Sequence, residues 1–295
     1  IYDMKKINST KKNYHPLLWP VIIGLVARLL SSFLSFGFHA KDDYFHVLEP
    51  ALKWIEDSQF NWDTSTLSGA GIRSYLIPKT VQYLVEFFNS LGVTEPETIL
   101  KLVQFAFGLY SLTVIPAVYL LAKRVFADSS NSEFSVNLAV WLSSIHFMMP
   151  YSGTRLLIEA MAMPPLVWGL WLVTYEQTNK IFWGGFWVGL ACWFRYQVGA
   201  LAVALAFVVF WRAFAEDRNL KKGLVHLAAL GVGGGLAVIL QGVYDLYTTG
   251  GFLQPVINNI MVNVHPNDSL SRSSALSYIG LWLAMTVPPA TFFIL

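Results

Sequence analysis

Apolar runs of about 20 residues recur along almost the whole chain, and they constrain the fold more than any other feature. A run of that length spans the ~30 Å hydrocarbon core of a bilayer as an α-helix. Of the 295 residues, 55% are hydrophobic and 13% are charged, whereas soluble domains carry about 25% charge. A soluble core stops growing at about 250–300 residues and could not bury this much apolar surface. The sequence therefore predicts an all-α, polytopic membrane protein.

About eight spans are expected within one transmembrane domain over residues 1–295. The last apolar run reaches the end of the sequence, so we expect the chain to be the N-terminal part of a longer polypeptide. One expected span, Ile181–Phe194, is short, which favours a broken or re-entrant helix buried against protein. The expected spans are Leu17–Phe36, Glu97–Ala122, Phe134–Met149, Leu156–Tyr175, Ile181–Phe194, Val198–Ala215, Gly223–Tyr247 and Tyr278–Leu295.

Lysine and arginine are unevenly distributed between the segments that join these spans. Such residues gather on the cytosolic side of membrane proteins. The N-terminus is therefore expected in the cytosol, and the long segments 37–96 and 248–277 outside it. A bacterial plasma membrane and an endoplasmic reticulum membrane fit equally well. The basic residues expected on the cytosolic side are Lys5, Lys6, Lys11, Lys12, Lys123, Arg124, Lys180, Arg212, Arg218, Lys221 and Lys222.

Charge and cysteine content exclude several classes of partner and site. A net charge of +2 is too small to indicate a nucleic-acid partner. The single cysteine, Cys192, excludes an intrachain disulfide and a cysteine-cluster metal site. His39 and His46 are seven residues apart, which is no standard ligand spacing, so a metal site on them is not favoured.

The first outer loop, residues 37–96, begins with an acidic pair, Asp42 and Asp43. Taken alone, two aspartates at this place are best explained as a helix start, because carboxylates complement the positive end of the helix dipole. The alternative is a general base that takes a proton from an acceptor hydroxyl. Apolar residues then recur at three–four spacing over Tyr44–Ile55, which predicts a helix in the membrane interface. Beyond Arg73 an apolar segment is expected to end at Pro78.

Four arginines lie in or near apolar surroundings, where charge is unfavourable and usually functional. They are Arg28, Arg73, Arg155 and Arg195, and the last three are expected near the outer face. Guanidinium groups bind phosphate through two parallel hydrogen bonds, so a phosphate-bearing lipid is a natural ligand. For Arg155, extension to the headgroups explains the residue equally well. Glu159 follows Arg155 at i+4 and would pair with it on a helix.

Four segments of the chain resemble motifs of glycosyltransferase family 22, which includes mannosyltransferases of GPI-anchor synthesis and lipid-linked oligosaccharide assembly. Residues 27–31 followed by 39–45 are similar to an Arg-Leu-Leu segment and a His-Pro-Asp-Glu-Tyr/Phe-Phe motif. Residues 71–78 resemble Arg-Ser-Tyr-x-x-Pro, and residues 154–159 an Arg-Thr-x-x-Asn-x-x-Glu segment with shorter spacing. Residues 189–195 resemble Gly-Leu-x-x-x-x-Arg. The order of these motifs relative to the spans makes the match fairly specific.

A weaker match and several departures accompany this resemblance. Tyr244–Tyr247 with Phe252, Asn259 and Asn263 resembles an Asp-x-x-Tyr-Tyr-Gly region followed by Asn-x-x-x-Asn. The acidic motif has one extra residue after His39, alanine replaces its proline, and its acidic pair is Asp-Asp. The expected asparagine before Glu159 is missing. These departures bear on acceptor specificity rather than on the reaction class.

The resemblance implies a GT-C-type fold and a metal-independent, inverting transfer of mannose or a related hexose. The donor would be a polyprenyl-phosphate sugar, and the acceptor a hydroxyl of a glycan or glycolipid at the outer face. Asp42, with Asp43 as positioning partner, would supply the base. Two other functions stay open: a lipid flippase or anionic-substrate transporter, against which the acidic outer loop argues, and a non-catalytic relative. The substrate-binding residues implied are Arg28, His39, Arg73, Arg155, Glu159 and Arg195.

Overall fold

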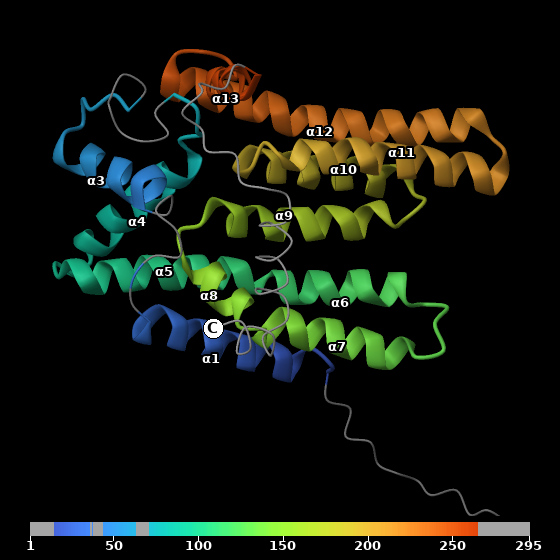
Figure 1. Ribbon diagram of the computed structural model, residues 1–295, viewed down its shortest axis with the longest axis horizontal. Helices are drawn as coiled ribbons and strands as arrows, with labels where there is room; N and C mark the ends of the chain where they lie inside the picture. Colours follow the sequence, from blue (N-terminus) through green and yellow to red (C-terminus); the bar gives the residue numbers. More distant parts are fainter. Residues whose placement is uncertain (1–14, 36, 38–43, 63–70, 265–295) are drawn as a thin grey trace, which may run out of the picture.

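The computed structural model describes residues 15–35, 37, 44–62 and 71–264, and every regular element in these ranges is a helix. Most helices lie side by side along the long axis of the protein, and α3, α4 and α13 gather at one end (Figure 1). That end, which carries α3, α4 and α13, is called the site end below. The helices are α1 (Leu18–Leu34), the π-helical η1 (Tyr44–Leu48), α3 (Glu49–Glu56), α4 (Leu76–Ser90), α5 (Pro96–Leu112), α6 (Val114–Val125), α7 (Ser132–Ile145), α8 (Met148–Thr154), α9 (Ile158–Val173), α10 (Thr178–Phe194), α11 (Val198–Asp217), α12 (Leu220–Thr249) and α13 (Gln254–Val264).

Three helical stretches in the described residues are long and apolar enough to cross a membrane: Pro96–Val125, Val198–Ala215 and Leu220–Thr249. Helices α8 and α9 together would make a fourth, but they meet at an angle of 113°. The expectation of about eight spans in a GT-C-type fold therefore stays a prediction. The expected span Tyr278–Leu295 lies outside the described residues, which end at residue 264.

The break expected in the short span Ile181–Phe194 is wrong, and the bend lies elsewhere. Helix α10 runs unbroken from Thr178 to Phe194. The chain bends instead between α8 and α9, where Arg155 and Leu157 have extended backbone angles. Helix α10 packs directly against α12 because glycines line the contact: a Cβ on Gly185 would collide with the carbonyl of Leu230. Small residues allow such close approach of helices in membranes.

At the site end, the helix expected over Tyr44–Ile55 is present as η1 and α3. A compact aromatic cluster of Trp54, Trp62 and Tyr75 holds α3 against the start of α4, with ring centroids 5.0–6.0 Å apart. The expectation that an apolar segment ends at Pro78 is wrong, because α4 begins at Leu76 and contains Pro78 in its first turn. Proline is tolerated there, since the first-turn N–H groups lack helical partners.

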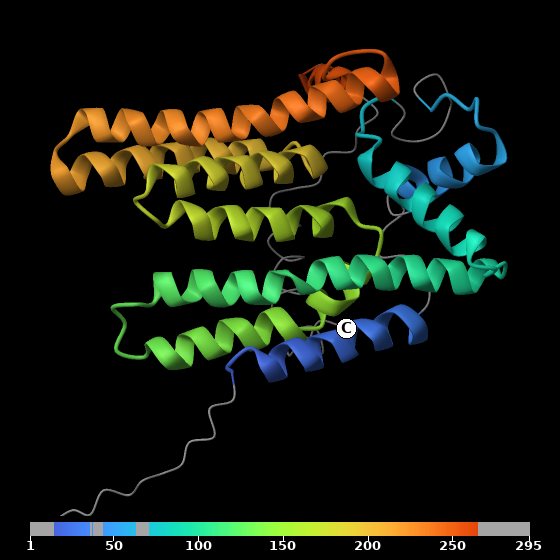
Figure 2. The same cartoon turned by 180° about the vertical axis from the view of Figure 1, so that it is seen from behind.

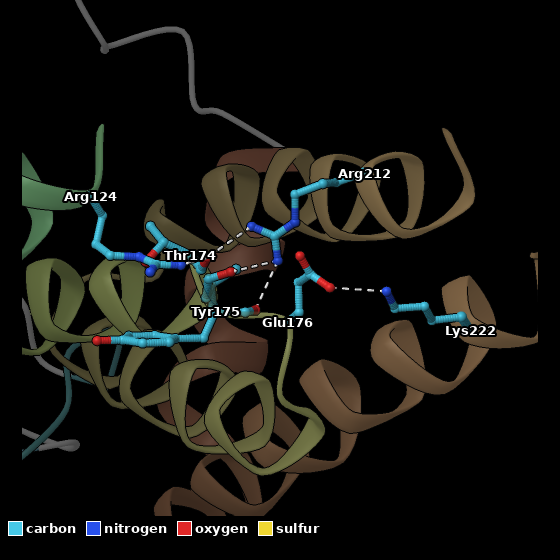
Figure 3. A network of polar contacts seen from close by, with 7 residues as sticks. Arg124, Thr174, Tyr175, Glu176, Arg212 and Lys222 are labelled. Atoms are coloured by element: carbon cyan, nitrogen blue, oxygen red, sulfur yellow. Dashed lines mark hydrogen bonds and ion pairs between the residues drawn. The ribbon is translucent and has the colours of Figure 1, made fainter. Parts of the chain in front are cut away.

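At the opposite end, arginines close the C-terminus of α9 (Figure 3). Arg212 donates hydrogen bonds of 2.9–3.2 Å to the carbonyls of Val173, Thr174 and Tyr175, and Arg124 donates to the Thr174 carbonyl at 3.0 Å. The last carbonyls of a helix have no partner inside it, and cations complement its negative end. The loops that join α6 to α7, α9 to α10 and α11 to α12 all lie at this end (Figure 2). Of the eleven basic residues expected on the cytosolic side, seven lie in these loops or in the helix ends that adjoin them: Lys123, Arg124, Lys180, Arg212, Arg218, Lys221 and Lys222.

Candidate functional site

A short turn before α4 carries Arg73 and Ser74, and later parts of the chain hold this turn in place. The Asn258 amide on α13 donates to the Gly71 carbonyl at 2.7 Å, and the Asn259 amide donates to the Ile72 carbonyl at 3.2 Å. Gly71 has a φ of +67°, a conformation that glycine adopts without steric strain. The turn is thus fixed through its backbone, directly before the two candidate side chains.

A small polar hollow lies between this turn and the end of α10. It measures about 10 Å³, and Arg73, Ser74, Trp193 and Tyr196 contribute to its lining. The Trp193 indole N–H donates to the Ser74 hydroxyl at 3.0 Å. The Tyr196 hydroxyl is buried, and no described residue forms a hydrogen bond with it. The hollow therefore combines one arginine, one serine and three aromatic side chains, Trp193, Phe194 and Tyr196, and the buried hydroxyl of Tyr196 is unbonded within the described residues.

Two charged groups of opposite sign act on Tyr196. Burial raises the pKa of the Tyr196 hydroxyl, the charge of Asp245 raises it further, and Arg73 lowers it. Asp245, on the last part of α12, is fully buried. The tyrosine therefore stays protonated at neutral pH, because a phenolate would be poorly solvated and would face a buried carboxylate.

An apolar cavity of about 320 Å³ adjoins the hollow. The two share Leu76, Ile77 and Phe194 in their linings. Side chains from α4, α5, α9 and α10 form the walls of the cavity. The Tyr110 hydroxyl in its lining is already satisfied, because it donates to the Met161 carbonyl at 3.0 Å. A cavity of this size with almost no polar lining suits a hydrocarbon group.

Glu159 and Arg195 form an ion pair at the site end, with 2.9 Å between Glu159 Oε1 and Arg195 Nη2. The side chains are 42% and 26% exposed, so both remain accessible. The alternative pairing of Glu159 with Arg155 is wrong. Arg155 lies in the break before α9, where the i+4 geometry of a helix does not apply.

Arg155 is 1% exposed and lies beneath the end of α1. Its Nη2 donates to the Ser35 hydroxyl, and its guanidinium carbon lies 4.8 Å from the Tyr151 ring centroid. Within the described part of the chain, Nε and Nη1 of Arg155 have no hydrogen-bond partner. The side chain is thus enclosed by protein, which argues against extension to the headgroups as its explanation.

Arg28 is fully buried among helices, in line with a paired role. Its Nε donates to the Ser111 hydroxyl on α5 at 2.8 Å, and its Nη1 donates to the Gly24 and Ser144 carbonyls at 3.1 and 3.3 Å. These bonds connect α1 to α5 and α7. Arg28 does not line the polar hollow.

Three of the predicted site residues, His39, Asp42 and Asp43, lie outside the described residues. Their role as base and substrate contact is therefore not tested. Among the residues that the structure describes, no group of three His, Cys, Asp or Glu side chains could hold a metal ion. Metal independence stays a prediction, since that finding does not extend to the acidic loop.

Sequence reasoning did not select Trp193, Tyr196 or Asn258. The sequence does contain a signal for Tyr196. Arg195 and Tyr196 together place two polar groups inside an apolar run, which is a pattern that could have indicated a functional role for both. Asp245 and Asn259 belonged to the weaker motif match. Both are buried, at 0% and 9% exposure.

Comparison with known proteins gives one match. The sequence model of the Alg9-like mannosyltransferase family matches residues 19–274. No curated protein and no solved structure matches the chain. The matched stretch contains both the acidic loop and the elements that build the hollow.

Proposed function

The chain belongs to the Alg9-like mannosyltransferase family, and from this membership we propose that it transfers mannose from a polyprenyl-phosphate donor to a hydroxyl of a glycan or glycolipid. The resemblance to glycosyltransferase family 22 is confirmed by the same match. The proposal places the reaction at the site end, facing the periplasm or the organelle lumen. The N-terminus would then lie in the cytosol.

One observation carries the choice of donor: the apolar cavity of about 320 Å³ opens beside the polar hollow. A polyprenyl-phosphate sugar has the same polarity pattern, with a hydrocarbon chain joined to a phosphate and a sugar. In this arrangement the first isoprene units occupy the cavity between α4, α5, α9 and α10. The sugar then lies at the end of α10, beside Arg73 and Trp193.

Arginine side chains supply the positive charge that the leaving phosphate requires. Arg195 is accessible and already oriented by Glu159, and Arg73 lines the hollow. When the sugar–phosphate bond breaks, negative charge grows on the phosphate oxygen. Fixed guanidinium groups stabilise that charge more effectively than water, because they need no reorientation.

The proposed base is Asp42, with Asp43 as its positioning partner. The base must reach the acceptor oxygen at about 2.6–3.2 Å, on the face of the sugar opposite the phosphate, so that inversion results. The acidic loop enters α3 through η1 at the site end. A base on this loop can therefore approach the same end as the hollow.

Transfer of radiolabelled mannose tests this function. The full chain in liposomes would receive polyprenyl-phosphate mannose, polyprenyl-phosphate glucose or a nucleotide sugar, with lipid-linked glycans as acceptors. We expect transfer from the polyprenyl-phosphate mannose and equal rates with and without chelator. Transfer from the nucleotide sugar alone would contradict the donor assignment, and loss of activity with chelator would contradict metal independence. Movement of the lipid across the bilayer without sugar transfer would favour the flippase.

A further inference from the structure

The Tyr196 hydroxyl, in the link between α10 and α11, is a buried polar group without a hydrogen-bond partner among the residues that the structure describes. Buried hydroxyls in folded proteins are almost always bonded, and an unmade bond destabilises the free protein. Such a group is retained when a ligand or an ordered water completes its bonding. Tyr196 also lines the polar hollow at the site end, so the missing partner has a place to lie.

The size of the hollow limits what that partner is. About 10 Å³ is close to the space that a single water oxygen needs. A phosphoryl group, with four oxygens around phosphorus, does not fit inside the hollow, so the phosphate that Arg73 stabilises in the proposed function would lie outside it. A single hydroxyl that projects from a larger ligand does fit.

The polar neighbours of Tyr196 also favour a neutral partner over an anion. Arg73 and the buried Asp245 act on it with opposite charges, so the surroundings do not select strongly for negative charge. Ser74 already accepts hydrogen bonds from the Trp193 indole at 3.0 Å and from the Leu76 N–H at 3.2 Å. A protonated tyrosine both donates and accepts, which matches a sugar hydroxyl.

We propose that the Tyr196 hydroxyl binds one hydroxyl of the transferred sugar and so helps to determine which sugar is accepted. This inference rests on the proposed function and deepens it. Since the hollow shares Leu76, Ile77 and Phe194 with the apolar cavity, a donor whose chain fills the cavity brings its sugar to Tyr196. A site that hydrogen-bonds a substrate hydroxyl rejects analogues that lack it.

The test compares wild type and Tyr196→Phe on polyprenyl-phosphate mannose and its four monodeoxy analogues. The substitution removes only the hydroxyl. We expect kcat/KM for the mannose donor to fall about tenfold. For one deoxy donor, Tyr196→Phe should have no further effect, because the partner of the tyrosine is already absent. Equal losses on all five donors, or no loss on any, would overturn the proposal. Tyr83→Phe, which removes a hydroxyl from a 63% exposed side chain on α4, should leave all five rates unchanged.

Thermal unfolding separates this contact from a structural role. We expect Tyr196→Phe to unfold at the same temperature as wild type or higher, because an unbonded buried hydroxyl is removed. A lower midpoint would show that the hydroxyl stabilises the free protein, and would overturn the proposal.

Donor binding separates the inference from the proposed reaction. A bound donor raises the unfolding midpoint, and this rise needs no transfer. Suppose that wild type transfers no mannose, but that one deoxy analogue fails to raise its unfolding midpoint as the mannose donor does. If Tyr196→Phe then shows the same midpoint with that analogue as with the mannose donor, the proposed reaction is wrong and the proposed contact is still supported. If none of the donors raises the unfolding midpoint of wild type, the proposed contact between Tyr196 and the sugar is overturned as well.

Discussion

Arg195 at the end of α10 and Glu159 in the first turn of α9 form an ion pair of 2.9 Å across the site end. Sequence spacing does not indicate this pair, since 36 positions separate the two residues. Exposed ion pairs contribute about 0–1 kcal/mol to stability, so stability alone explains the pair poorly. Under the proposed function an orienting role fits better: the Glu159 carboxylate would hold the Arg195 guanidinium where the donor phosphate can reach it.

Arg195→Ala should weaken donor binding more than acceptor binding, because the leaving phosphate belongs to the donor. We expect the donor KM to rise about tenfold or more, since hydrogen bonds to charged groups contribute about 1.5–3 kcal/mol. Steady-state kinetics with each substrate varied in turn measures the two effects. Lys53→Ala removes another exposed ion pair, with Glu56, and should change neither KM. A larger rise in the acceptor KM than in the donor KM would contradict the assignment.

Asp42→Asn should abolish sugar transfer while leaving membrane insertion intact, because the amide cannot take a proton from the acceptor. A positioned base contributes about 10²–10⁴-fold to the reaction rate. Because Asp43 is only the positioning partner of that base, Asp43→Asn should lower the transfer rate less than Asp42→Asn does. Transfer assays on membranes with matched protein levels measure both. Asp57→Asn changes a carboxylate at the C-cap of α3 and serves as the control. Wild-type transfer rates in both Asp42→Asn and Asp43→Asn would show that neither aspartate is the base.

Arg28→Ala should lower stability rather than substrate affinity. The side chain is fully buried and bonds Ser111 and Ser144 on two other helices. Its removal leaves a cavity and unpaired acceptors, which we expect to cost about 2–5 kcal/mol. Denaturant unfolding in detergent measures the loss, and Leu29→Ala, on an exposed side chain, should change stability little. A normal midpoint with a raised donor KM would instead assign Arg28 to substrate binding.

Asn258→Ala should loosen the turn that carries Arg73. The variant loses a hydrogen bond of 2.7 Å to the Gly71 carbonyl, worth about 1 kcal/mol, and the transfer rate should fall because Arg73 is less fixed. Unfolding midpoints and initial rates measure the two effects. Ile257→Ala truncates the neighbouring exposed side chain on α13 and should leave the rate unchanged. An unaltered rate in Asn258→Ala would show that this bond does not position Arg73.

Acid should weaken the start of α5 through Glu95. Hydrogen bonds from Thr98, through its side chain and its N–H, and from the Glu97 N–H hold the pKa of the Glu95 carboxyl below its usual value. A lowered folded-state pKa means that the stabilisation is present above the unfolded-state pKa and is lost as pH falls through the folded-state value. The midpoint difference between wild type and Glu95→Ala should therefore shrink on acidification. A difference that is constant between neutral and acidic pH would contradict this.

The sequence predicts local features of this protein better than distant ones. Apolar periodicity predicts the helices, including the one after the acidic loop, and the motif order predicts the family. The partners of Arg28 could not be predicted, because Ser111 and Ser144 lie 83 and 116 positions away. The bend before α9 was missed because Arg155 and Leu157 adopt extended angles inside an apolar run, where propensity favours a continuous helix. The hollow could not be predicted from the sequence for a different reason: four segments that are distant in the sequence contribute to its lining or hold it in place.

The glycine-lined contact between α10 and α12 has a consequence for substrate choice. Helix α10 carries Trp193 and α12 carries Tyr244, and their ring centroids lie 5.4 Å apart beside the hollow. A side chain added at Gly185 or Gly233 would collide with the facing helix. These two glycines therefore help to determine the relative position of α10 and α12 along their axes. Gly185 lies about 12 Å along α10 from Trp193 at 1.5 Å per residue. A change of sugar preference can therefore arise from a glycine that touches no sugar, through the offset between two neighbouring helices.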